Sequence, residues 1–177
     1  MASLLIGLMI IALIVVAALA LEDASLSSAS EISASWDHMT GRTGDRARTE
    51  LTLITADVGG GGSNIDISLR NTGQTALADF SRWDVVLQYF EKPNNRDMRV
   101  LWLPYTTDAD PPSGQWTVRG LYLVVDSVPE VYEPNVFNPG EEMLVRLSLT
   151  PAIPANTDNI VTVGVSNGVT MAAPFSR

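Results

Sequence analysis

The chain has 177 residues, of which 46% are hydrophobic and 18% are charged, and its formal net charge is -9. This acidic balance, with Lys and Arg scattered along the chain, excludes the electrostatic footprint of a nucleic-acid-binding protein. There is no cysteine and a single histidine, His38, which excludes disulfides, thiolate catalysis and the usual zinc sites. We expect no cofactor and no metal, and the length accommodates one domain plus an additional segment.

The first predicted element is an apolar helix. Every residue from Leu4 to Leu21 is apolar apart from Gly7, and the first charged residue is Glu22. These eighteen residues would rise about 27 Å as an α-helix, which is close to the hydrocarbon thickness of a bilayer. A secretory signal peptide normally places Lys or Arg before such a run, and none precedes it here. The segment therefore indicates a membrane anchor or the core helix of an assembly.

The helical pattern continues past the apolar run. Apolar and small residues recur at spacings of three or four from Leu26 to Trp36, and neither Gly nor Pro lies between Glu22 and Gly41. We predict that the helix ends at about His38, so that residues 1–40 form the helical segment and residues 41–48 a linker. Such a rod would be roughly 55 Å long, more than one head domain can cover, whereas laterally packed copies of the same helix would bury it.

Small residues in the rod, such as Gly7 and Ala17, would let neighbouring helices approach closely. The residues predicted to form the shared core are Leu4, Leu5, Ile6, Gly7, Leu8, Ile10, Ile11, Leu13, Ile14, Val15, Leu19, Leu21 and Leu26.

From residue 49 onwards the helical spacing gives way to the alternation that is typical of strands. Ile65, Ile67 and Leu69, for example, alternate with polar residues. The predicted strands are 49–58, 65–69, 83–90, 98–103, 120–125, 143–149 and 160–165, with a possible last one at 169–172. We therefore predict an α+β fold in which a long N-terminal apolar α-helix precedes an all-β head, an immunoglobulin-like sandwich spanning residues 49–177.

One turn and the strand after it form a distinct motif. Asn71 and Gly73 have turn chemistry, Leu77 and Phe80 are suited to closing one end of the sandwich, and the strand then alternates from Val85. The residues of this motif are Asn71, Gly73, Leu77, Phe80, Trp83 and Val85. Three tryptophans, Trp83, Trp102 and Trp116, are predicted to fill the core because they lie in or beside strands.

Candidate chemistry is sparse. Asp108 and Asp110 could offer oxygen ligands to calcium, but their spacing is not that of an EF-hand, and a solvated acidic loop explains them better. His38 beside Asp37 and near Ser35 is better explained as a helix surface than as a catalytic group. We therefore predict no catalytic residue and no enzyme. The uncharged C-terminal run 160–174 is either a contact between neighbouring heads or an ordinary last strand.

An apolar N-terminal helix that leads through a Ser/Ala-rich stretch into a β-rich head resembles the archaellins (archaeal-type flagellins) and the wider type IV pilin superfamily. Bacterial type IV pilins usually have Glu at the fifth mature position, where this chain has Leu5, and this departure favours the archaellin-like branch. The absence of a basic residue before the apolar run fits a chain numbered from its mature end. The stretch from Asn71 to Val85 is also similar to the β-sandwich heads of archaellum stator subunits.

The resemblance implies a structural subunit of an extracellular, cell-surface filament used for motility or adhesion, with the predicted shared core as the filament core. Its implied partners are further copies of itself in a helical homopolymer, the membrane before assembly, a prepilin-type peptidase, and an assembly platform with its ATPase. The alternative that it leaves open is a membrane-anchored archaellum stator or minor pilin subunit.

Overall fold

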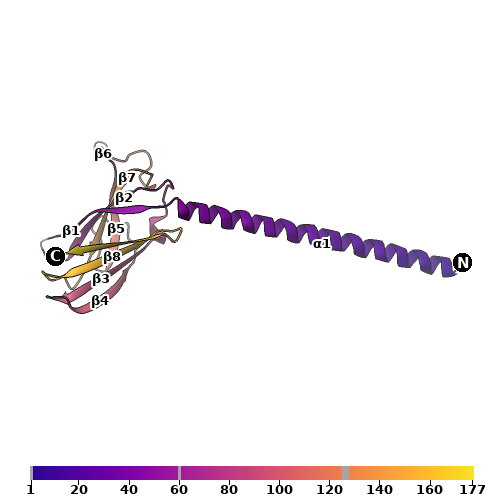
Figure 1. The fold of residues 1–177 in the computed structure, drawn as a ribbon, viewed down its shortest axis with the longest axis horizontal. Coiled ribbons are helices and arrows are strands. Elements are labelled where there is room, and N and C mark those ends of the chain that lie inside the picture. The colour runs from indigo at the N-terminus through magenta and orange to yellow at the C-terminus, as the bar shows by residue number, and fades with distance from the viewer. Residues whose placement is uncertain (1, 60, 125–127) are drawn as a thin grey trace. The chain divides into compact units, whose positions relative to one another are not determined.

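The computed structural model describes residues 2–59, 61–124 and 128–177, and of residues 2–5, 18, 23, 24 and 26 it describes the backbone alone. One long helix is followed by strands (Figure 1). The elements are α1 (Ala2–Ala47), β1 (Leu51–Val58), β2 (Asn64–Asn71), the short 3-10 helix η1 (Phe80–Arg82), β3 (Asp84–Lys92), β4 (Arg96–Leu103), β5 (Gln115–Leu123), β6 (Val128–Pro129), β7 (Glu141–Ser148), β8 (Asp158–Gly164) and β9 (Thr170–Ser176). The chain divides into two compact units, Met1–Gly44 and Asp45–Arg177.

The helix runs further than the sequence predicted. The predicted helix end at about His38 was wrong, because α1 continues to Ala47. Residues 41–48, which were expected to form a linker, are helical over all but the last position. Gly41 and Gly44 cost roughly 1 kcal/mol each in a helix interior but do not forbid one. Local bonds support the extension: the Thr43 hydroxyl donates to the Met39 carbonyl at 2.9 Å, and Arg48 pairs with Asp45 at 3.0 Å.

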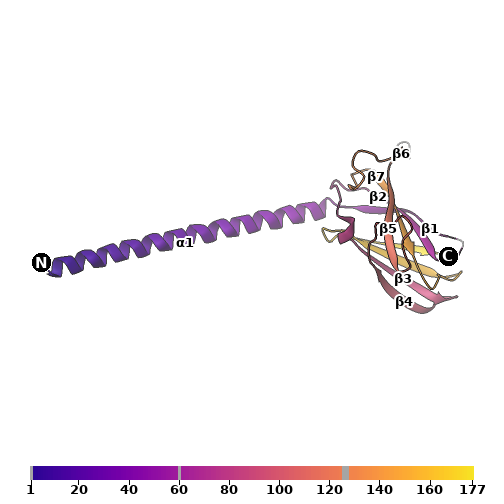
Figure 2. The same ribbon diagram turned by 180° about the vertical axis from the view of Figure 1, so that it is seen from behind.

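The second unit contains two antiparallel sheets. The five-stranded sheet has the order β1-β2-β7-β5-β6 and the four-stranded sheet the order β4-β3-β8-β9 (Figures 1 and 2). The first four strands of the former correspond to strands A, B, E and D of the immunoglobulin fold, and β3, β8 and β9 correspond to C, F and G, with β4 as an added edge strand. The predicted α+β fold with a β-sandwich head is confirmed.

Alternating side chains from both sheets form the core. In β2 and β7 every second residue is buried, so that Ile65, Ile67 and Leu69 face Met143, Val145 and Leu147 across the register of the two strands. Trp83 and Trp116 are buried, as predicted, and each packs edge-to-face against a neighbouring ring.

The predicted strand 120–125 is β5, which begins earlier, at Gln115. Val125 lies outside the described residues, and β6 was not predicted from the sequence.

The last turn of α1 belongs to the second unit. The Asp45 carbonyl accepts from the Thr75 hydroxyl at 3.3 Å and from the Thr49 hydroxyl at 2.7 Å. Arg46 donates to the Gly168 carbonyl at 3.4 Å, and Asn167 donates to the Thr49 hydroxyl at 2.7 Å. This turn therefore joins two loops of the sandwich, and the natural start of the head is Asp45.

We expect a protein that comprises residues 45–177 to be more stable than one that comprises residues 49–177. The shorter protein lacks the hydrogen bonds of Asp45 and Arg46, each worth about 0.5–1.5 kcal/mol. Urea denaturation followed by tryptophan fluorescence should show a lower midpoint for the shorter protein, with an unchanged slope. Equal midpoints would show that the last turn of α1 contributes nothing to the head.

Candidate assembly surfaces

The described large apolar side chains in the first half of α1 are exposed. By length and composition the helix could cross a membrane, and none of the residues in its most apolar window is buried. Nine side chains of the predicted core are exposed over 52–72% of their surface: Ile6, Leu8, Ile10, Ile11, Leu13, Ile14, Val15, Leu19 and Leu21. Nothing would contact a Cβ at Gly7. Leu4, Leu5 and Leu26 lie in α1, but their side chains are outside the described part.

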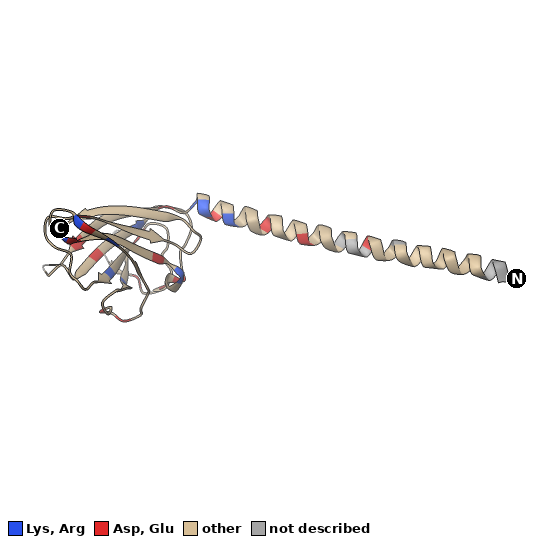
Figure 3. Ribbon diagram, turned by 90° about the horizontal axis from the view of Figure 1, so that it is seen from below, with Lys and Arg blue, Asp and Glu red and all other residues tan. Residues whose placement is uncertain are grey.

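The second half of α1 has a different surface. Figure 3 shows its charged residues, which begin only after the apolar half. Ile32, Trp36 and Met39 follow one another at spacings of four and three, so they share a helix face, and all three are exposed by more than half. This apolar stripe is therefore also available to a neighbour.

The turn motif is a structural element of the head. Asn71 is fully buried, and its amide donates to the carbonyls of Thr75 and Phe137, at 2.9 Å each, while its oxygen accepts from the Gly73 backbone N–H at 3.1 Å. A Cβ at Gly73 would lie 2.5 Å from the backbone of Arg48, which only glycine avoids. The remaining residues of the motif are buried apolar side chains: Leu77, Phe80, Trp83 and Val85.

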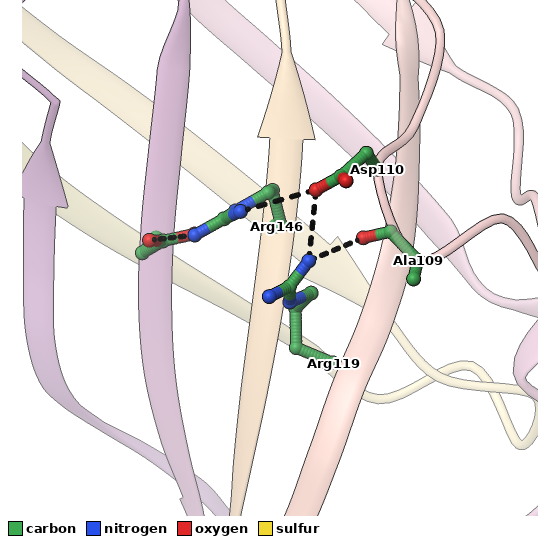
Figure 4. Close-up of polar contacts among 5 residues, drawn as sticks. Ala109, Asp110, Arg119 and Arg146 are labelled. Atoms are coloured by element: carbon green, nitrogen blue, oxygen red, sulfur yellow. Dashed lines mark hydrogen bonds and ion pairs between the residues drawn. The ribbon is translucent and has the colours of Figure 1, made fainter.

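The outer face of the five-stranded sheet is polar and internally paired (Figure 4). On β7, the Arg146 guanidinium makes two 2.6 Å bonds to the Asp66 carboxylate on β2 and lies 3.4 Å from Asp110. On β5, Arg119 donates to the same Asp110 oxygen at 2.9 Å and to the Ala109 carbonyl at 2.7 Å. Hydrogen bonding to Asp66 raises the pKa of Arg146, against the opposing effect of burial. Such a face is suited to contact with water.

Replacing Arg146 with Gln should destabilise the head by about 1–2 kcal/mol, because a half-buried, two-pronged ion pair is lost and the Asp66 carboxylate is left without its guanidinium partner. Arg48→Gln is the matched control, since that pair is half-exposed and local, and its loss should cost less than about 0.5 kcal/mol. Urea denaturation of both variants measures the difference. Equal losses would contradict a special role for the Arg146 pair.

The outer face of the four-stranded sheet is apolar, which sequence reasoning missed. Trp102 was expected in the core, but it is 56% exposed, because its register partner on β3 is the outward-facing Val86. Met98 and Val100 point the same way and are 61% and 60% exposed. We call this surface the apolar sheet face; its outward apolar side chains are Val86, Phe90, Met98, Val100, Trp102, Ile160, Ala172 and Pro174, with Gln88 and Thr162 among them.

A signal for this face is present in the sequence. In β4 the inward Leu101 and Leu103 alternate with equally apolar outward residues, so the strand is apolar on both faces. Antiparallel strands with one face in water normally alternate with polar residues, so this strand indicates a covered outer face. The run 160–174 proves to be parts of β8 and β9, whose inward side chains are buried and whose outward ones extend the apolar sheet face.

Of the two aspartates considered for calcium, Asp110 contacts Arg119 and Arg146, whereas Asp108 is exposed and makes no ion pair with any described residue. Two acidic side chains nearby in sequence are also paired, Asp97 with Lys92 and Glu91 with Arg99 at 2.7 Å. Among the described residues no group of three His, Cys, Asp or Glu side chains is placed to hold a metal ion. His38, Asp37 and Ser35 are exposed on α1.

No protein-family model and no curated protein sequence matches this chain. Among solved structures, the archaeal flagellum of Methanospirillum hungatei strain JF1 is similar, with a TM-score of 0.62 and 15% identity over 96% of this chain and 90% of that one. The archaellum periplasmic stator protein FlaG from Sulfolobus acidocaldarius has a TM-score of 0.50 and 18% identity over 72% of this chain and 99% of its own. The archaeal flagellin FlaB1 from Methanocaldococcus jannaschii has a TM-score of 0.51 and 16% identity over 72% and 88%.

At these identities the likeness shows the fold. Because α1 holds 46 of the 177 residues, a match over 96% of the chain includes most of the helix as well as the head. The head thus has the fold of archaellum filament and stator proteins, and the likeness to the Methanospirillum hungatei flagellum extends to the N-terminal apolar helix.

Proposed function

We propose that this chain is a structural, non-enzymatic subunit of an archaellum-like or type IV pilus-like filament at the cell surface, and that it assembles into a homopolymer through α1. The supporting observation is the apolar surface of α1, exposed on all sides in the single chain. Burying a Leu or Ile side chain is worth roughly 1.5–3 kcal/mol, so the predicted core would dominate the free energy of assembly. Parallel copies of the same helix can cover such a surface all round.

The second candidate is a membrane-anchored archaellum stator or minor pilin subunit, which is supported by the likeness of the head to FlaG. The length of α1 favours the filament. Its 46 residues rise about 69 Å, whereas the hydrocarbon core of a bilayer takes up about 30 Å. Lipid alone would leave Ile32, Trp36 and Met39 in water, and neighbouring helices would cover them.

On this proposal α1 first holds the precursor in the membrane and then enters the filament core. The prepilin-type peptidase and the assembly platform with its ATPase, expected from the resemblance, would act between these two states. Residues 41–48 would connect the core to the outer layer of heads as a mainly helical linker.

Ile10→Asp should abolish filaments while leaving the head folded. It places a carboxylate among packed apolar helices, where an unpaired charge costs several kcal/mol in every subunit. Ile10→Leu is the matched control and should form filaments, because it conserves volume and polarity. Electron microscopy of cell-surface filaments gives the outcome, and urea denaturation checks the head. Filaments at normal yield in the Ile10→Asp strain would place this helix outside a filament core.

Ala17→Phe distinguishes a filament core from a single anchor. A core of close-packed helices has no room for the added ring, so filaments should be lost or distorted, whereas a helix surrounded by lipid accepts a larger apolar side chain. Deletion of the gene completes the test. The filament itself should disappear, and filaments that persist at normal number and diameter in the deletion strain would establish the stator alternative.

A further inference from the structure

The apolar sheet face needs a cover that the single chain does not provide. Trp102 shows this most clearly, because its indole N–H already donates to the Asp84 carboxylate at 3.0 Å. Its one polar atom is satisfied, and what remains for a partner is the apolar ring. The opposite sheet provides the contrast, since its outward charges neutralise one another within the head. The outer face of the five-stranded sheet is therefore suited to contact with water, whereas the apolar sheet face exposes apolar surface to it.

A second exposed apolar surface lies in the segment that follows β5. Val131 and Tyr132 are 76% and 94% exposed, and Val128 is 46% exposed. We call residues 128–134 the β6 knob. A protruding tyrosine beside a valine is typical of a residue that enters a partner's surface, because aromatic side chains supply large apolar contacts at low entropic cost.

The β6 knob is held in one conformation by its own acidic residues. The Glu130 carboxylate accepts the backbone N–H groups of Tyr132 at 2.6 Å and Glu133 at 3.2 Å. These bonds lower the pKa of Glu130 below its ordinary value. Asn138 donates to Glu133 at 3.1 Å. The knob is thus presented as a preformed element, which reduces the entropy lost on docking.

The two apolar surfaces lie on different sheets and on opposite sides of the head. Strand β6 is an edge strand of the five-stranded sheet and β4 is an edge strand of the four-stranded sheet, and Figures 1 and 2 both show these two strands far apart. The knob of one head therefore cannot cover that head's own sheet face. Contact between two different patches is heterologous, and such contacts build rings or open helical filaments.

The β6 knob and the apolar sheet face carry opposite charges. The knob carries Glu130 and Glu133, whereas β4 carries Arg96 on its outward side, at one end of the apolar sheet face. Arg96 is exposed and makes no ion pair with any described residue. In a protein with a net charge of -9, an available cation beside an apolar strand favours an acidic partner.

We infer that the β6 knob of one copy docks on the apolar sheet face of the next copy, with Val131 and Tyr132 packed against Met98, Val100 and Trp102. This inference rests on the proposed filament, because it takes the neighbouring copy as the partner. The heads then form head-to-tail rows outside the helical core.

The chain has no cysteine, so introduced thiols can report this contact without background. The full chain with Val100→Cys and Tyr132→Cys, assembled into filaments, should react with a short bis-maleimide to give a ladder of trimers and higher species, since each copy then links to two others. Tyr132→Cys combined with Thr55→Cys, which is exposed on the first strand of the other sheet, is the matched control and should give no ladder.

The single variants separate the alternatives. Dimers from Val100→Cys alone, without a ladder from the pair, would mean that two sheet faces meet, and this would overturn the inference. Filaments whose double variant stays monomeric would also overturn it, while the filament proposal stood. Absence of filaments from the wild-type chain would instead refute the proposed function itself.

Discussion

Uncovered apolar surface on the first half of α1 is the constraint on which the rest of the structure depends. The helix has no core of its own, and nine of its predicted core side chains are more than half exposed. The head must therefore fold without it, around a closed core from both sheets. The buried Asn71 amide donates hydrogen bonds to two backbone carbonyls in the turn beside the last turn of α1. The polar groups at this end of the head are therefore paired without the rest of the helix.

The two outer faces of the sandwich differ in polarity: one is charged and the other is apolar. On one, Arg146 and Arg119 share Asp110, so charges that are far apart in sequence neutralise one another at the surface. On the other, Trp102 and Val100 stand exposed on an edge strand. Natural edge strands usually carry charges or bulges that prevent association. An edge strand that keeps an apolar outer face is consistent with selection for contact rather than against it.

Sequence periodicity predicted the helix, the sandwich and most strands because each depends on local alternation. It could not place Trp102, since β4 is apolar on both faces and only its pairing with Val86 decides which side is outward. The helix end was missed because Gly41 and Gly44 were weighed by propensity, while the bond from Thr43 to Met39 favours continuation. The pairing of Asp110 with Arg146 joins residues from different parts of the chain, which no local pattern reveals.

In the proposed assembly, the apolar surface of α1 would supply most of the binding free energy, and the contact between heads would fix the relative position of the subunits. Apolar side chains of similar size recur along α1, so shifting one helix past another loses little burial, and a core of this kind binds tightly without fixing a unique offset. A knob that presents Tyr132 and Glu130 fits only where an apolar patch meets a cation, as at Met98 and Arg96 on β4. Contacts of this second kind contribute less free energy but reject wrong positions. The position of each subunit would then be set by its head, although the helix holds it in place.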